Sequence, residues 1–320
     1  MRIFIIFLFV FWFSYAEERV KYIMGVPVSV AAPEVDEQFF EPFRKVDKYF
    51  SLYRNDSVLC RLNREKQLKA DKFFMDLLKK SIEINRETDG FFDISIGNIT
   101  YRYGDFVEGC GFIKTDSYGM ENILIKENQV FLKNGISLDF GGIAKGYAVD
   151  IVSDMLKKRG IKGIVKASGD IRCLKECEIC IKDPFSDKPF ACFSTKNDET
   201  GVSTSGIYER FRGSMQDNHL INPLTKKSAS NIISITLIGT VDNTSLDAYA
   251  TTVSVMPVER TVSFLNKKKL GFFLITKDCY LQGSFNSLYI KDLTFFSDLK
   301  ECKETQINSH KNDRSKKYTE

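Results

Sequence analysis

The chain of 320 residues contains only two histidines, His219 and His310. Because zinc enzymes usually bind their metal through several histidine side chains, this scarcity argues strongly against a zinc enzyme. The net charge is only +4, which is too weak to indicate nucleic-acid binding. No internal repeat and no Pro-rich or Gly/Ser-rich linker marks a domain boundary. Hydrophobic residues make up 43% of the chain, so a sizeable core is possible.

An apolar run occupies the N-terminus. Residues 3–13 are unbroken apolar positions after Met1-Arg2, and Ser14-Tyr15-Ala16 ends the run with small residues at the two sites that signal-peptide cleavage needs. The run is about half as long as a membrane span. We therefore predict a signal peptide over residues 1–16, with an uncleaved N-terminal anchor as the alternative. In either case the folded part would work outside the cytoplasm.

Eight cysteines follow this segment: Cys60, Cys110, Cys173, Cys177, Cys180, Cys192, Cys279 and Cys302. Four of them cluster between residues 173 and 192 and include one C-x-x-C. A zinc site or a redox pair is the functional interpretation, but no second C-x-x-C is present. We favour a structural role, as disulfides or as free thiols, and the pairing does not follow from the sequence.

The hydrophobic patterns predict helices and strands in mixed order. Helices are expected at 33–50, 71–88, 145–159 and 242–256, strands at 19–31, 163–171, 232–238, 270–275 and 280–290, and hairpins at 122–133 and 173–185. This order favours an α+β fold with mixed or antiparallel sheets and packed helices. One domain is expected over residues 17–303, followed by a polar, disordered tail at 304–320.

The most informative stretch is residues 136–149, I-S-L-D-F-G-G-I-A-K-G-Y-A-V. A short apolar run ends in Asp139, and Gly141, Gly142, Lys145 and Gly146 follow where a helix begins. Glycines let a backbone approach a ligand closely, and the N–H groups at a helix start favour an anion. The stretch predicts a turn that holds a phosphorylated ligand, with a plain strand–helix corner as the alternative.

Asp247 and Thr251 lie four residues apart on the predicted helix 242–256. This spacing puts both oxygens on one helix face, and hard oxygen ligands suit Mg²⁺. The alternative is a dipole-favoured acid beside a packed threonine.

Other candidate residues each have two interpretations. His219 is either a general base or a structural histidine before the Asn222-Pro223 turn. Asp93, Asp139 and Asp170 could bind ligand hydroxyls or cap turns, and Tyr53 could stack on a planar ring or belong to ordinary surface.

In their order, these residues resemble the ApbE family of FAD:protein FMN transferases. The resemblance covers about residues 22–296. The stretches that carry it are M-G at 24–25, S-L-Y-R-N-D-S-V-L-C-R-L-N at 51–63, T-D-G-F-F-D-I-S-I-G at 88–97, L-D-F-G-G-I-A-K-G-Y-A-V-D at 138–150, S-G-D-I-R at 168–172, T-S-G-I-Y-E-R at 204–210, H-L-I-N-P-L-T at 219–225 and D-A-Y-A-T at 247–251.

The resemblance implies an ApbE-like (T-fold-like) architecture and an exported bacterial enzyme, in the periplasm or at the outer face of the inner membrane. Such enzymes split FAD with Mg²⁺ and attach FMN through a phosphoester bond to a threonine of a partner protein, and AMP is released. The partner is a flavoprotein or redox subunit with a Ser/Thr-Gly-Ala-Thr-like motif. Some relatives instead hydrolyse FAD to FMN and AMP.

The resemblance also implies roles for single residues. The metal would be held by the Gly142 carbonyl, Asp247 and Thr251, and Asp139 and Lys145 would contact FAD. The flavin or adenine pocket would be lined by Met24, Tyr53, Asp93 and Ile221. His219 would take the proton from the incoming threonine.

Several positions depart from the family pattern. Gly97-Asn98 stands for Gly-Pro, Asn222-Pro223 for Asp-Pro, Lys226 for a glycine and Ser168-Gly169-Asp170 for Gly-Gly-Asp. The segment 98–120 is short and lacks an expected helix. These changes concern FAD contacts and partner docking. The competing hypotheses are an FAD pyrophosphatase and a non-catalytic FAD-binding protein.

Overall fold

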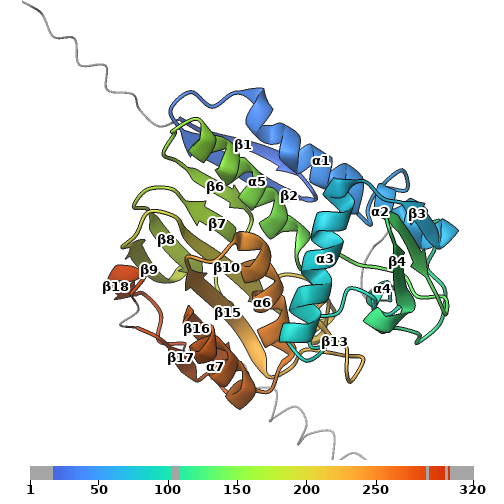
Figure 1. The fold of residues 1–320 in the computed structure, drawn as a ribbon. Helices are drawn as coiled ribbons and strands as arrows, with labels where there is room; N and C mark the ends of the chain where they lie inside the picture. Colours follow the sequence, from blue (N-terminus) through green and yellow to red (C-terminus); the bar gives the residue numbers. More distant parts are fainter. Residues whose placement is uncertain (1–16, 103–108, 286–287, 300–301, 303–320) are drawn as a thin grey trace, which may run out of the picture.

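An eight-stranded antiparallel sheet runs through the computed structural model (Figure 1), which describes residues 17–102, 109–285, 288–299 and 302. The predicted signal peptide at 1–16 and tail at 304–320 lie outside these residues. In spatial order the strands are β1 (Glu17–Ile23), β2 (Val26–Ala32), β6 (Ile164–Ala167), β7 (Asp170–Cys173), β10 (Thr200–Gly206), β15 (Ile232–Gly239), β16 (Gly271–Thr276) and β17 (Leu281–Gly283).

Smaller sheets surround this main sheet. They are β3 (Gln67–Lys69), β5 (Gln129–Leu132) and β4 (Ile123–Lys126); β18 (Ile290–Phe295), β9 (Pro189–Thr195) and β8 (Glu178–Lys182); β11 (Phe211–Arg212) with β12 (Ser214–Asn218); and β13 (Ile221–Asn222) with β14 (Lys227–Ser228). Phe193 of β9 stacks on Phe273 of β16 with ring centroids 5.8 Å apart. This contact packs the β18–β9–β8 sheet against the main sheet.

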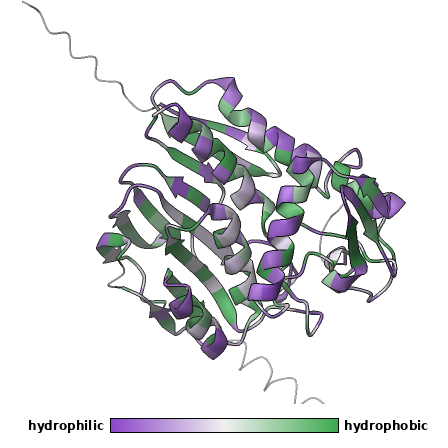
Figure 2. Ribbon diagram, viewed as in Figure 1, coloured by the Kyte–Doolittle hydropathy of each residue, from purple (hydrophilic) through white to green (hydrophobic). Residues whose placement is uncertain are grey.

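Some helices pack on the main sheet and others lie beside the β3–β5–β4 sheet (Figure 1). The helices are η1 (Glu37–Phe40), α1 (Glu41–Phe50), α2 (Val58–Glu65), α3 (Lys72–Glu87), α4 (Gly97–Thr100), η2 (Met120–Asn122), α5 (Ala144–Lys158), α6 (Asn243–Val255) and α7 (Val258–Lys267). α5 and α6 lie side by side across the middle strands of the main sheet (Figure 1). Figure 2 shows hydrophilic residues along α1 and α3 and apolar residues along the main sheet. No helix in the described ranges is both long and apolar enough to span a membrane.

The predicted α+β class with antiparallel sheets is confirmed. Helix starts follow side-chain caps: Asp71 accepts a hydrogen bond from the Phe74 N–H before α3, and Asp242 accepts one from the Ser245 N–H before α6. α6 is buried along almost its whole length, so it forms the inner layer against the sheet.

Two predicted strands are each hairpins. Met24 and Gly25 have φ of 59° and 71°, which is the geometry of a two-residue hairpin turn, so 19–31 divides into β1 and β2. Ser168 has a φ of 54°, and 163–171 divides into β6 and β7 at this residue.

Two predictions near the cysteines are also wrong. The hairpin expected at 173–185 lies further along the chain, where β8 pairs with β9. Its turn begins at Asp183, whose carboxylate accepts a hydrogen bond from the Phe185 N–H at 2.8 Å. The strand expected at 280–290 is two strands, since β17 pairs with β16 whereas β18 pairs with β9.

All eight cysteines form disulfides, in agreement with the predicted structural role. The pairs are Cys60–Cys110, Cys173–Cys177, Cys180–Cys192 and Cys279–Cys302.

Candidate active site

The glycine turn lies where α5 begins against α6. Residues 136–138 belong to no named strand and pair only through an isolated bridge between Ser137 and Ile96, so the predicted strand before the turn is wrong. The Thr251 hydroxyl lies 3.5 Å from the Gly142 carbonyl oxygen. A Cβ at position 142 would lie 2.8 Å from that hydroxyl oxygen, so glycine lets the turn approach α6.

Lys145, the second residue of α5, lies between two buried carboxylates. Its Nζ donates to Asp247 Oδ1 at 2.9 Å and lies 3.2 Å from Asp170 Oδ2. The other oxygen of Asp247 accepts from the Gly146 N–H at 3.0 Å, and Ser203 donates to Asp170 Oδ1 at 2.6 Å. These contacts join α5, α6, β7 and β10 at one point.

The charges in this cluster are strongly coupled. Burial and the neighbouring Asp247 carboxylate raise the pKa of Asp170 to about 7, although Lys145 and Ser203 lower it. Burial alone would lower the pKa of Lys145, but the two carboxylates hold it above its ordinary value. Two buried carboxylates therefore share one partly exposed ammonium group, which is an environment that favours a cation.

The Asp139 carboxylate is used within the turn. It accepts from the Thr100 hydroxyl and from the Gly141 N–H, both at 2.7 Å, and burial raises its pKa. The Asp139 N–H donates to the Ile94 carbonyl at 2.7 Å, which joins the turn to the segment that carries Asp93. Burial also raises the pKa of Asp93, whose carboxylate accepts from the Ser95 N–H. Through these hydrogen bonds both carboxylates fix the conformation of their loops, independently of any ligand.

His219 has a defined tautomer. Its Nδ1 lies 3.0 Å from the Arg210 carbonyl oxygen. A carbonyl oxygen only accepts hydrogen bonds, so Nδ1 carries the hydrogen and Nε2 keeps its lone pair. Burial lowers the pKa of His219 to about 4. The imidazole is therefore neutral at physiological pH, with Nε2 free to accept a proton.

Met24 and Tyr53 line a surface hollow of about 440 Å³ between the β1–β2 turn and the end of α1. The Arg210 side chain donates to the Tyr53 hydroxyl at 3.1 Å. The guanidinium carbon lies 6.0 Å from the centre of the tyrosine ring. Arg210 thus links the tyrosine to the backbone that orients His219.

The structure gathers some predicted residues and separates others. Gly142, Lys145, Asp247 and Thr251 lie together at the α5–α6 contact. Ile221 is buried in a separate small cluster with Ile96 and Ile99.

Two residues of this region had no role assigned in the predicted FAD and metal site. Asp170 and Arg210 lie in the stretches S-G-D-I-R and T-S-G-I-Y-E-R. The stretch S-G-D-I-R is the sequence signal for Asp170, and it indicates a ligand-binding residue or a turn cap. Arg210 ends the stretch T-S-G-I-Y-E-R, but its contacts with Tyr53 and His219, which are 157 and 9 residues away, do not follow from that stretch.

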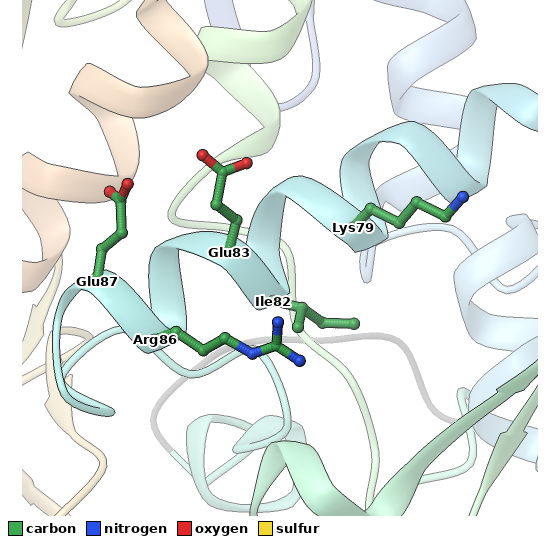
Figure 3. A pocket seen from close by; sticks show the side chains of 5 residues that line it. All are labelled: Lys79, Ile82, Glu83, Arg86 and Glu87. Carbon is green, nitrogen blue, oxygen red and sulfur yellow. The ribbon is translucent and has the colours of Figure 1, made fainter.

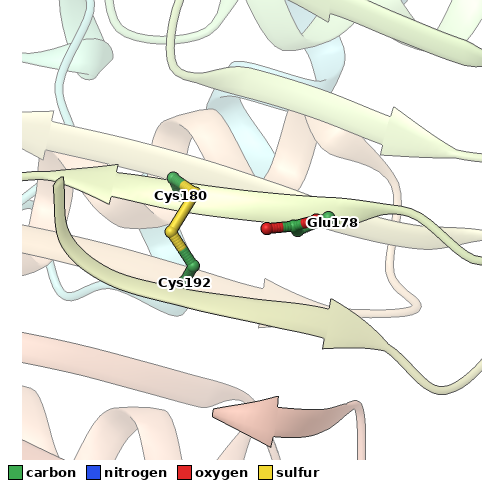
Figure 4. A group of neighbouring side chains, drawn as sticks. All are labelled: Glu178, Cys180 and Cys192. Atoms are coloured by element: carbon green, nitrogen blue, oxygen red, sulfur yellow. A yellow bond between two sulfur atoms is a disulfide. The ribbon is translucent and has the colours of Figure 1, made fainter. Parts of the chain in front are cut away.

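Two other features do not form an active site. A hollow on α3 is lined by Lys79, Ile82, Glu83, Arg86 and Glu87 (Figure 3). These side chains come from a single helix, and Glu87 already accepts from Tyr249 and Lys268. Glu178, Cys180 and Cys192 lie close enough for a metal, but the two sulfurs are bonded to each other (Figure 4).

The family model for the ApbE family matches residues 24–274. The chain belongs to the ApbE family. This confirms the resemblance and the prediction that the chain is an enzyme of this family. The FAD:protein FMN transferase of Vibrio cholerae is 26% identical over 257 residues, which are 73% of this chain and 76% of the relative. The FAD:protein FMN transferase of Klebsiella pneumoniae is 31% identical over 155 residues, 47% of this chain and 49% of the relative.

Solved structures of the ApbE family share the fold. The ApbE protein of Thermotoga maritima superimposes with a TM-score of 0.76 at 24% identity, covering 85% of this chain and 97% of that chain. The flavin transferase ApbE of Vibrio cholerae gives a TM-score of 0.71 at 22% identity, covering 84% and 97%. The expected ApbE-like architecture is thereby confirmed.

Proposed function

We propose that this chain is an exported FAD:protein FMN transferase that requires Mg²⁺. It would cleave FAD, attach FMN through a phosphoester bond to a threonine of a target flavoprotein and release AMP. The observation that carries this proposal is the Lys145–Asp170–Asp247 cluster beside Gly142 and Thr251, in a chain of the ApbE family.

The oxygens at the α5–α6 contact fit a Mg²⁺ ion. The Gly142 carbonyl, the Thr251 hydroxyl and the Asp247 carboxylate are hard oxygen donors. Asp170 Oδ2 is buried and has no hydrogen-bond partner in the described part of the chain apart from its ion pair with Lys145 at 3.2 Å, so this oxygen can accept a further cation. When bound, Mg²⁺ would neutralise the pyrophosphate charge that develops as AMP leaves. Lys145 and the cation would compete for Asp247 Oδ1.

The protein side chains have separate tasks in this proposal. His219 Nε2 takes the proton of the threonine hydroxyl. The threonine oxygen forms a bond to the FMN phosphorus, and the bond from that phosphorus to the bridging oxygen breaks, so AMP leaves with the electron pair. Lys145 and Asp139 would hold the nucleotide from the turn. Met24, Tyr53, Asp93 and Ile221 would line the flavin or adenine pocket.

The partner would present its threonine in an exposed Ser/Thr-Gly-Ala-Thr-like motif. Binding energy spent on holding that hydroxyl in line with the phosphorus would supply much of the rate. Because the chain would act outside the cytoplasm, the partner would be an exported or membrane-associated flavoprotein.

The test is to incubate the protein from residue 17 with FAD, Mg²⁺ and a domain carrying the motif. Covalent flavin on the domain and release of AMP support transfer. Free FMN and AMP without labelling would instead identify a pyrophosphatase, and bound intact FAD a binding protein.

Asp247→Ala should reduce labelling at least about 100-fold, because it removes a buried carboxylate from the proposed metal site. Asp154→Ala is the matched control, since Asp154 is an exposed acid on α5. If Asp247→Ala labels the target at the wild-type rate in Mg²⁺, the proposed metal site is wrong.

A further inference from the structure

The glycine turn is held from outside by the end of α2. Asn63, in the last turn of α2, is fully buried. Its side-chain oxygen accepts from the Leu138 N–H at 2.7 Å, and its side-chain nitrogen donates to the Leu138 carbonyl at 2.9 Å. Asn63 thus supplies the pairing that a neighbouring strand would give, one residue before Asp139.

Lys66 holds the same segment with its ammonium group. The residue ends α2 with a φ of 58°. Its Nζ donates to the Ile136 carbonyl at 2.8 Å and the Ser137 hydroxyl at 3.0 Å, and lies 3.4 Å from the Gly111 carbonyl, its third acceptor. No carboxylate of the described residues forms an ion pair with Lys66, and burial lowers its pKa to about 8. A half-buried ammonium with only neutral partners is retained at a cost, so its hydrogen bonds matter.

The Cys60–Cys110 disulfide is a third connection between α2 and the segment before the turn. Both cysteines are fully buried. Gly111, which follows Cys110, packs so closely on α2 that a Cβ there would overlap the Asn63 backbone. The Gly111 carbonyl also accepts from the Ser137 hydroxyl at 3.2 Å. The disulfide therefore ties residues 109–111 to α2, and these residues contact the segment before the turn.

We propose that Cys60, Asn63 and Lys66, with Cys110, form an α2 clamp that positions the Asp139–Gly142 turn for FAD. The clamp residues contact residues 111 and 136–138, whereas none of their described hydrogen bonds reaches Lys145, Asp247 or Thr251. Lys66 is thus a positioning residue. The expected effect of Lys66 on FAD binding rests on the proposed function. Its expected effect on the order of the turn rests only on the contacts of the clamp.

The test compares Lys66→Met with wild type, at a temperature where circular dichroism shows both to be folded. Two quantities are measured: FAD affinity in Mg²⁺, and amide hydrogen exchange over residues 136–143. We expect FAD binding to weaken about tenfold or more and exchange in this segment to accelerate, while α6 stays protected. Lys69→Met is the matched control, because Lys69 is an exposed lysine three residues away.

A second comparison separates positioning from general stability. Leu265→Ala removes a fully buried side chain from α7 and should lower the melting temperature without changing either quantity. If Lys66→Met does not fold, the double variant Cys60→Ser/Cys110→Ser tests the same clamp and should accelerate the same exchange.

Wild-type exchange at 136–143 in a folded clamp variant would overturn the proposal, as would an equal acceleration in Leu265→Ala. Failure of the wild-type protein to bind FAD would count against the proposed function, while the exchange data would still decide on the clamp.

Discussion

At the scale of single residues, the Arg210 carbonyl determines how His219 can act. It accepts from Nδ1, which leaves Nε2 as the basic atom, and burial keeps the ring neutral. A histidine with the ordinary pKa of 6.5 would be half protonated in mildly acidic medium, whereas His219 would stay available as a base well below that pH.

This shift makes stability depend on pH. Because the pKa of His219 is lowered to about 4 in the folded protein, only the unfolded chain takes up the proton as pH falls below 6.5. The stability that His219 contributes is complete above 6.5 and is lost as pH falls toward 4. Urea unfolding of wild type and His219→Gln should show their difference shrinking by about 2 to 3 kcal/mol between pH 7.5 and 4.5. A difference that does not change with pH would contradict the lowered pKa of His219 in the folded protein.

Local signals predicted some site residues and could not predict their contacts. Glycines and a helix start identified the turn, and the four-residue spacing put Asp247 and Thr251 on one face of α6. The sharing of Lys145 between Asp170 and Asp247 depends on packing among α5, α6 and β7. The hydrophobic pattern of a single segment does not show which side chains of other segments will lie beside it.

At the scale of elements, the site depends on the close approach of α5 and α6. A Cβ at Gly146 would overlap the Asn243 carbonyl oxygen and lie 2.9 Å from Asp247 Cβ. Asp150 strengthens the contact by accepting from the Asn243 and Thr244 N–H groups, both at 2.8 Å. The two helices therefore act as one unit beside the oxygens that are proposed to bind the metal.

Gly146→Ala should separate these helices. We expect the free energy of unfolding to fall by about 1 to 3 kcal/mol, as in other overpacked contacts, together with a higher Mg²⁺ concentration at half-maximal activity. Lys158→Ala, on the exposed end of the same helix, is the control and should change neither quantity. An unchanged Mg²⁺ requirement in a folded Gly146→Ala protein would show that the helix contact does not set the metal site.

The element predictions were wrong where a turn interrupts a continuous apolar pattern. Met24 and Ser168 take positive φ angles although neither is a glycine, and the glycine after each, Gly25 or Gly169, was a turn signal that the strand-like pattern outweighed. The helices were predicted more accurately, because cap residues such as Asp71 and Asp242 mark their starts.

At the scale of the whole molecule, the four disulfides differ in the length of chain that they close. Cys60–Cys110 spans 50 residues, whereas Cys173–Cys177 spans 4. By loop entropy, replacing the first pair with serines should cost about 4 kcal/mol and replacing the second about 2 kcal/mol. Guanidinium unfolding of the two double variants measures this order, and a reversed order would show that native contacts outweigh loop length.

The proposed export makes a prediction about the mature chain. If a signal peptidase cuts after Ala16, the exported protein begins at Glu17, the first residue of β1. N-terminal sequencing of the protein secreted to the periplasm of a bacterial host should give Glu-Glu-Arg-Val. A mature protein that retains Met1 or the apolar run would indicate the uncleaved anchor instead.

The order of strands in the main sheet also affects the timing of folding. The hairpin β1–β2 is made first during synthesis, but Val28 pairs with Ala167 of β6. The sheet can therefore be completed only after more than half of the chain has left the ribosome. Such distant pairing slows folding, and if the chain is exported as proposed, slow folding would keep it open long enough to cross a membrane and be oxidised on the far side.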